Sequence, residues 1–229
     1  MSFLWERASS VCYASTSYLF SGSIPKPATS ASVFSVNISA DHTFSKTSQP
    51  SVTLVTGLGI EDDAHMGKTV QHMFNKTRNP DMVNLRQVSF MEVEFLNGLT
   101  KENPGEKVVP GELGENITTS GFRLLELKTG ALLEFHDGEE EEEEKESDEF
   151  PAVEQEPPRV RIQGLRNPCS LIEKHGKGLR AQCLEKDPAT GVITLRKTGV
   201  MGTVERGGVI RPGMKIVVAE EGKGELKVV

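Results

Sequence analysis

The sequence predicts a mainly β protein of the α+β class, built as a β-barrel with a few short helices. Two observations support this: short segments in which apolar residues alternate with polar ones, and frequent turn residues between them, with 22 Gly and 12 Pro in 229 residues. Many short strands separated by such turns are typical of barrels and sandwiches. A chain of this length can bury a substantial core, so we expect one folded domain with additions.

The first strand is expected near Ala31, because Phe34, Val36 and Ile38 alternate with polar residues in the period of a half-buried strand. Residues 1–30 lack this pattern, so we expect a disordered leader there. Their composition, rich in Ser and Ala, also resembles that of a mitochondrial presequence. We expect a cytoplasmic protein, with a mitochondrial location as the alternative.

Four further elements are predicted between residues 52 and 135. A strand over 52–55 runs into a glycine turn, and a second strand covers 85–90. A short helix over 91–99 would place Val93 and Leu96 on one face. A hairpin with a tight turn at its middle is expected over 124–135.

The sharpest change of composition is an acidic segment, 138–157, which contains six consecutive glutamates at 139–144. Such a stretch cannot bury enough apolar surface to order itself, so it is predicted to be a disordered insertion between two strands. The strand that follows carries Val160 and Ile162 and is expected to turn at Gly164.

A helix over 177–185 is expected next, with Leu179 and Ala181 on its apolar side. Strand-like segments and glycine turns over 192–218 suggest a meander that closes a sheet. Residues 219–229 are interpreted as a C-terminal tail outside the domain.

Charge and cysteine content exclude several classes of function. A formal charge of −7 argues against a broad nucleic-acid footprint and against binding to an anionic membrane. No apolar run approaches the length of a membrane span. The three cysteines, Cys12, Cys169 and Cys183, are too few and too widely spaced for a disulfide framework or a four-cysteine zinc site. We expect a reduced intracellular protein.

Cys169 follows Asn167-Pro168 at the end of a predicted strand and precedes a helical segment. A helix start and Arg166 would favour its thiolate, the form that attacks sulfur or binds a soft metal. From spacing alone, however, a lone cysteine is more often an inert small apolar residue.

A resemblance changes that balance. Six groups of residues, covering in order most of residues 31–218, resemble a stand-alone MOSC domain, the C-terminal module of molybdenum cofactor sulfurases. They are Phe44-Ser45-Lys46, GLGIEDDAH at 57–65, NLRQV at 84–88, PGELGENITT at 110–119, GLRNPC at 164–169, and GVMG at 199–202 with RPG at 211–213. The resemblance implies a MOSC-type β-barrel over 31–218 that cradles molybdopterin, the pterin of the molybdenum cofactor. In that family the cysteine that matches Cys169 is the proposed sulfur carrier or molybdenum ligand.

The same groups supply candidate cofactor contacts. Guanidinium groups grip phosphates with paired hydrogen bonds, although ordinary surface ion pairing is an alternative for each cation. Side chains of Asn and Thr could bond the heterocycle or merely stabilise turns. The candidates are Lys46, Arg86, Asn116, Thr118, Thr119, Arg166 and Asn167.

Other polar residues are assigned no chemistry. Asp62, Asp63 and His65 could mimic a carboxylate–histidine metal site, but the resemblance explains their loop without a second metal, and many relatives have glycine at the position of Asp62. The remaining histidines with no partner at ligand spacing are expected at the surface; they are His72, His136 and His175. Cys183 is expected to pack in the core.

Three functions stay open. The resemblance implies a molybdenum-dependent oxidoreductase that acts on N-hydroxylated compounds. Because the chain has no dinucleotide, flavin or iron–sulfur motif, a separate electron-donor reductase would be needed. Alternatively, Cys169 carries persulfide sulfur received from a separate desulfurase, since the pyridoxal-phosphate desulfurase domain of the sulfurases does not fit in 229 residues. A non-catalytic module that docks on a partner through the acidic insertion is the third.

Overall fold

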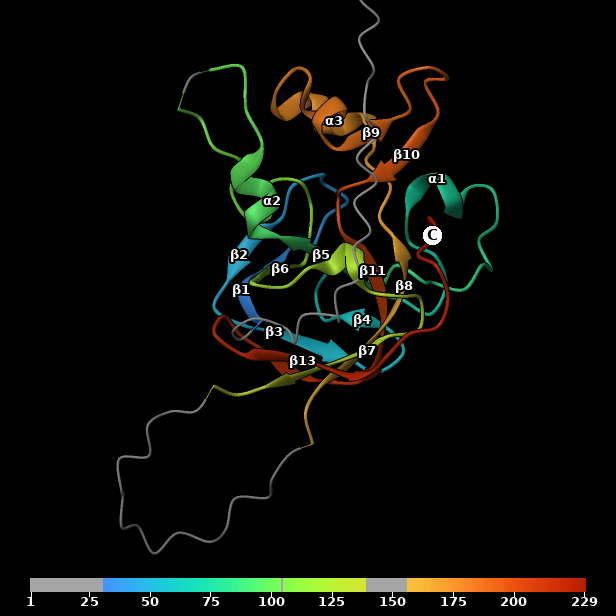
Figure 1. Ribbon diagram of the computed structural model, residues 1–229. Helices are drawn as coiled ribbons and strands as arrows, with labels where there is room; N and C mark the ends of the chain where they lie inside the picture. The colour runs from blue at the N-terminus through green and yellow to red at the C-terminus, as the bar shows by residue number, and fades with distance from the viewer. Residues whose placement is uncertain (1–30, 104, 139–155) are drawn as a thin grey trace, which may run out of the picture.

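The computed structural model describes residues 31–103, 105–138 and 156–229 (Figure 1). The predicted disorder of 1–30 and of nearly all of 138–157 lies outside these ranges. The strands are β1 (Ser32–Ile38), β2 (Thr47–Gln49), β3 (Val52–Val55), β4 (Gly59–Ile60), β5 (Val88–Glu92), β6 (Ile117–Ser120), β7 (Leu132–His136), β8 (Arg159–Leu165), β9 (Leu184–Lys186), β10 (Ile193–Arg196), β11 (Val200–Arg206), β12 (Gly208–Ile210) and β13 (Lys215–Glu220). The helices are α1 (Met73–Lys76), α2 (Val93–Gly98) and α3 (Leu179–Gln182), with 3-10 turns η1 (Leu124–Glu126) and η2 (Ser170–His175).

Seven of the described strands close into a barrel in the order β13-β7-β8-β11-β5-β6-β1, and the pairing of β1 with β13 completes the circle. Neighbouring barrel strands are antiparallel except β5 and β6, which are parallel. Closure gives each of these seven strands a neighbour on both sides, whereas β2 remains at an edge beside β1. The predicted fold class, a mainly β barrel with a few short helices, is confirmed.

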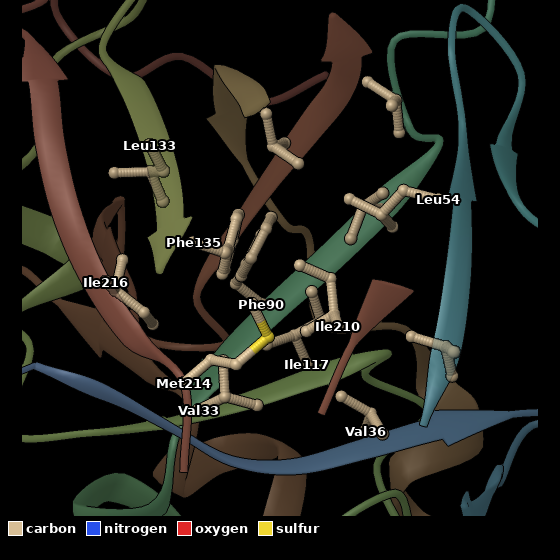
Figure 2. Packing of buried hydrophobic residues seen from close by; sticks show 14 of the residues in the cluster. Val33, Val36, Leu54, Phe90, Ile117, Leu133, Phe135, Ile210, Met214 and Ile216 are labelled. Atoms are coloured by element: carbon tan, nitrogen blue, oxygen red, sulfur yellow. The ribbon is translucent and has the colours of Figure 1, made fainter. Parts of the chain in front are cut away.

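The barrel interior is filled by one apolar cluster. Phe90 of β5 and Phe135 of β7 stack at its centre with ring centroids 6.3 Å apart, and Ile117, Met214 and Ile216 pack around them (Figure 2). A second cluster joins α2 to η2 and α3 through Leu96, Ile172 and Leu179. Figure 1 shows α2, α3 and the β9–β10 pair gathered at one end of the barrel.

The orientation predicted for β1 is correct for Val36 and Ile38 but wrong for Phe34. Val33 and Val36 are buried, whereas Phe34 is half exposed and Asn37 is fully buried. The register with β6 shifts between Val33 and Ser35, so a bulge reverses the faces that simple alternation would give.

The hairpin predicted over 124–135 was also wrong. Residues 124–126 form a 3-10 turn, and the strand begins only at Leu132. Thr129 instead forms a bridge with Gly224, and the amide of Gly130 donates to the carbonyl of Ile162 at 2.8 Å. Partners distant in sequence therefore replace the local turn.

Three predictions near the C-terminal end need correction. Strand β8 continues through Gly164 instead of turning there. The helix over 177–185 is reduced to α3, and Ala181 is exposed. The segment 192–218 is no meander, because β11 pairs with β8 and β5 whereas β13 pairs with β7 and β1. By contrast, β3 and the burial of Val93 and Leu96 in α2 agree with the sequence.

The barrel register brings the separate sequence motifs together. Leu165 of β8 lies opposite Val200 of β11, Val200 lies opposite Phe90, and Phe90 lies opposite Ile117 of β6. Arg166 follows the first of these residues and Asn116 precedes the last. In the described part of the chain, no helix is long and apolar enough to cross a membrane.

Candidate functional site

A cavity of about 530 Å³ opens where these motifs meet. Ligand sites typically enclose roughly 300–1,000 Å³. Its walls include Lys46, Arg86, Asn116, Arg166, Asn167 and Cys169, which are six of the predicted site residues. They come from segments spread over more than half of the chain, so the barrel brings them together.

Lys46, directly before β2, is buried and forms an ion pair with Asp63 in the loop after β4. Asp63 also accepts hydrogen bonds from Asn116 Nδ2 at 3.0 Å and from the His65 amide at 3.0 Å. Burial opposes ionisation of Asp63, but bonds from His65 and the charge of Lys46 outweigh it and hold its pKa below the usual range. Asp63 therefore orients one wall of the cavity, and Lys46 already has a counter-ion.

Arg166, directly after β8, is half-buried. Its Nη2 donates to the carbonyl of Leu113, and its Nη1 has no hydrogen-bond partner among the described residues. Burial lowers the pKa of Arg166, and the nearby carboxylate of Glu115 partly offsets that effect. The two groups form no ion pair within 4.0 Å. A buried donor without a hydrogen-bond partner destabilises the folded protein, so a ligand with an acceptor atom would be favoured at Arg166 Nη1.

Glu115 also has a buried polar atom without a hydrogen-bond partner among the described residues. Its Oε1 accepts from the Gly111 amide at 2.5 Å and from Thr118 Oγ1 at 3.1 Å, whereas Oε2 has no partner among the described residues. Burial raises the pKa of Glu115, opposed by the Gly111 bond and by the charge of Arg166. Glu115 and Arg166 thus each have one buried polar atom that bonds nothing among the described residues.

Gly114 explains why this loop can lie against Arg166. Its φ of +82° is in the left-handed region, and a Cβ there would clash with the carbonyl oxygen of Phe44 and stand 3.3 Å from Arg166 Nη2. The glycines of the 110–119 motif thus allow the backbone to approach the cavity wall closely.

Arg86 is the second guanidinium of the cavity. Its Nη1 donates to the main-chain oxygen of Val229 at 3.3 Å, and in the described ranges it makes no ion pair with a carboxylate side chain. Burial, followed by the charge of Arg166, lowers the pKa of Arg86 to about 10. Arg86 is therefore still positively charged at neutral pH.

Cys169 lies directly before η2, is half-buried and faces the same cavity. Neighbouring bonds hold its loop: Asn167 Oδ1 accepts from Arg196 Nε at 3.0 Å, and Thr198 Oγ1 donates to the Arg166 carbonyl at 2.8 Å. The helical segment expected after Cys169 is thus a 3-10 turn. Its thiol is accessible from the cavity, whereas Cys183 is fully buried and burial raises the pKa of Cys183 to about 11.

Three histidines of the cavity wall were not predicted. His42 and His65 stack edge to face with ring centroids 5.3 Å apart, and His72 lines the same cavity. Burial, followed by the charge of Arg86, lowers the pKa of His72 to about 4, and its Nδ1 has no partner among the described residues. The expectation that His72 is a surface residue was therefore wrong. No spacing signal links these histidines, because their proximity depends on how the loops fold over the barrel.

Two predicted contacts lie elsewhere. Thr118 and Thr119 are buried in β6, where their hydroxyls bond Glu115 and the Met91 carbonyl, and they are not among the cavity-lining residues. Asp62 is exposed, and the described residues contain no group of three or more metal-ligating side chains that could hold an ion. His175 bonds Glu112 and Ser45, and His136 bonds Glu134.

Comparison with known proteins adds a family and a fold. The family model of the MOSC domain matches residues 61–217. The crystal structure of the YuaD protein from Bacillus subtilis is similar with a TM-score of 0.58 and 20% identity, covering 82% of this chain and 94% of that one. YiiM from Geobacillus stearothermophilus gives 0.53 and 22%, covering 86% and 78%. These identities support the fold alone. The comparison with curated proteins gives no match.

Proposed function

The chain belongs to the MOSC domain family, and from that premise we propose that its cavity binds the molybdenum cofactor, with a phosphate on Arg86 and Arg166 and with Cys169 at the metal. The family is associated with this cofactor. The proposal concerns which residues of this chain hold it.

The observation that carries the proposal is the pair of half-buried arginines beside Cys169, one of which has a buried donor atom with no partner in the described ranges. Neither Arg86 nor Arg166 forms an ion pair with a carboxylate side chain in the described ranges, and Arg166 Nη1 bonds nothing there. Burying an uncompensated charge costs several kcal/mol, roughly, unless a counter-ion binds. In a chain of net charge −7, such a local excess of positive charge favours an anionic ligand.

The residues present also fit the two ends of such a cofactor. Paired guanidinium donors suit a phosphate, and the half-buried thiol of Cys169 suits a soft metal. Lys46 and Asn116, both held by Asp63, also line the cavity. When bound, the cofactor supplies redox chemistry at molybdenum, and the protein supplies binding, orientation and exclusion of water.

The reaction we propose is the reduction of N-hydroxylated compounds, by a cytoplasmic protein that receives electrons from a separate reductase. An alternative is sulfur transfer, in which Cys169 holds persulfide sulfur delivered by a separate desulfurase. The exposure of Cys169 to the cavity favours this alternative equally, because a carrier thiol must be reachable by its donor. If neither chemistry depends on Cys169, a docking module remains.

The test is to purify the full chain from a host that makes molybdenum cofactor, then measure molybdenum by elemental analysis and pterin by fluorescence. We expect both in similar molar amounts. Arg86→Lys keeps the charge but loses the paired donors, so it should lower pterin occupancy, while Arg211→Lys at an exposed ion pair should not. Protein that carries neither molybdenum nor pterin would contradict the proposal.

A further inference from the structure

We propose that residues 227–229, which follow the end of the matched family region at 217, form a wall of the anion site and hold Arg86 in place. This inference rests on the proposed function, because it assigns a role to Arg86 in binding an anion. The segment 221–229, called the strap below, was expected to be a tail outside the domain.

The strap is docked by main-chain bonds. After β13 ends at Glu220, Gly224 bridges to Thr129, and the chain then runs beside the end of β8. The Leu165 amide donates to the Lys227 carbonyl at 2.8 Å, and the Val229 amide donates to the Leu165 carbonyl at 3.3 Å. The strap therefore extends the sheet in parallel next to Arg166 and Cys169. In Figure 1 its red end lies beside α1.

Gly164 leaves the space that the strap occupies beside β8. A Cβ at this position would clash with the Lys227 carbonyl oxygen and would stand 2.9 Å from Val229 Cγ1. Gly164 lies within β8 and pairs with Met201 beside a register shift, but its φ is not in the left-handed region, so its backbone conformation does not require glycine. The absence of a side chain is explained by the strap, which lies 63 residues further on.

The strap then meets the ligand site. Val228 and Val229 line the cavity together with Cys169, and the main-chain oxygen of Val229 accepts from Arg86 Nη1. This bond occupies one of several guanidinium donors and leaves the others for a ligand. The two valines add apolar surface to the cavity wall beside Arg86. A charge–charge interaction strengthens several-fold when the effective dielectric falls from about 80 to about 20.

The experiment titrates the full chain with inorganic phosphate by calorimetry, comparing four variants with the unmodified protein. Deletion of 227–229 removes the last three residues of the strap. Gly164→Ala displaces these residues, because the added Cβ would clash with the Lys227 carbonyl oxygen. We expect each to weaken phosphate binding by about tenfold, because Arg86 would be less firmly oriented and the effective dielectric around it would rise. Gly98→Ala, where a Cβ meets open space, is the control and should bind as the unmodified protein does. Arg86→Ala should bind most weakly.

Two further readouts separate positioning from general damage. Deleting 227–229 in the Arg86→Ala background should cause no additional loss of phosphate binding, because the strap acts through Arg86. Hydrogen exchange of the Leu165 amide should rise in Gly164→Ala, which reports that the strap has left β8. Phosphate binding that is unchanged or tighter after strap displacement would overturn this inference while leaving the anion site intact. Absence of phosphate binding by the unmodified protein would overturn both.

Discussion

At the scale of single residues, Asp63 organises the candidate site more than any of the residues expected there. Its carboxylate holds Lys46, Asn116 and His65 at once. The sequence marked Asp63 only as part of a GLGIEDDAH motif, because no local pattern shows that two of its partners, Lys46 and Asn116, come from distant segments. Arg86, Arg166 and Cys169, by contrast, could be predicted, since each lies within a short motif of the family.

Replacing Asp63 with Asn should destabilise the fold. Lys46 would remain buried without its counter-ion, and breaking one side of a buried pair costs roughly 3–5 kcal/mol. Urea unfolding measures the loss. The control is Asp62→Asn, an exposed neighbour whose φ of 61° Asn tolerates, and it should change stability by less than about 0.5 kcal/mol. Equal stability of the two variants would show that the pair contributes nothing.

The same substitution predicts a pH dependence. Because the folded-state pKa of Asp63 lies below its ordinary value of 3.8, its contribution to stability is present above that value and is lost as the pH falls through the folded pKa. The difference in unfolding free energy between the unmodified protein and Asp63→Asn should therefore be largest near neutral pH and shrink below about pH 4. A difference that grows on acidification would contradict the assigned sign.

Cys169→Ser should leave the fold intact, because a half-buried sulfur-to-oxygen change is modest, while molybdenum-dependent reduction or persulfide formation should be lost. Cys183→Ala is the matched control, in the second apolar cluster, and should keep the activity even where it lowers the melting temperature. Activity assays with substrate and mass spectrometry of the persulfide are the measurements. Full activity and full cofactor occupancy of Cys169→Ser would leave the docking module as the remaining function.

At the scale of elements, the sequence predicted where strands occur better than what they pair with. The strand β3 and the buried face of α2 follow from local alternation and spacing. The bulge in β1 and the bridge from Thr129 to Gly224 depend on partners far along the chain. Gly164 was interpreted as a turn because the sequence does not show that the strap packs against it. Local pattern carries no information about such tertiary contacts.

One element-scale prediction concerns the acidic segment. Strands β7 and β8 are antiparallel neighbours, with Leu132 opposite Arg161, so 139–155 connects two strands that already pair. Replacing 139–155 with a short Gly-containing turn should change the free energy of unfolding by no more than about 1 kcal/mol, since a shorter loop is easier to close. Thermal melting measures this. A large fall in melting temperature would mean that the segment packs on the barrel.

At the scale of the whole molecule, a net negative chain contains a cavity rich in positive charge. An anionic ligand that binds only the folded state should therefore stabilise it, by about 2.7 kcal/mol at a free ligand concentration 100 times the dissociation constant. Protein that retains molybdenum cofactor should melt at a higher temperature than the same protein after the cofactor is removed. Differential scanning calorimetry checks this, and identical melting temperatures would argue against binding in the cavity.

The pairing of β1 with β13 has a consequence for how the chain is made. Ser32 of the first barrel strand pairs with Lys215 of the last. During synthesis the first strand therefore leaves the ribosome long before its partner. Until the last strand appears, β1 has an open edge on one side, and contacts of such high sequence separation form slowly. The barrel can therefore close only after nearly the whole domain has been translated, and during that interval its unpaired strand edges are open to pairing with other chains.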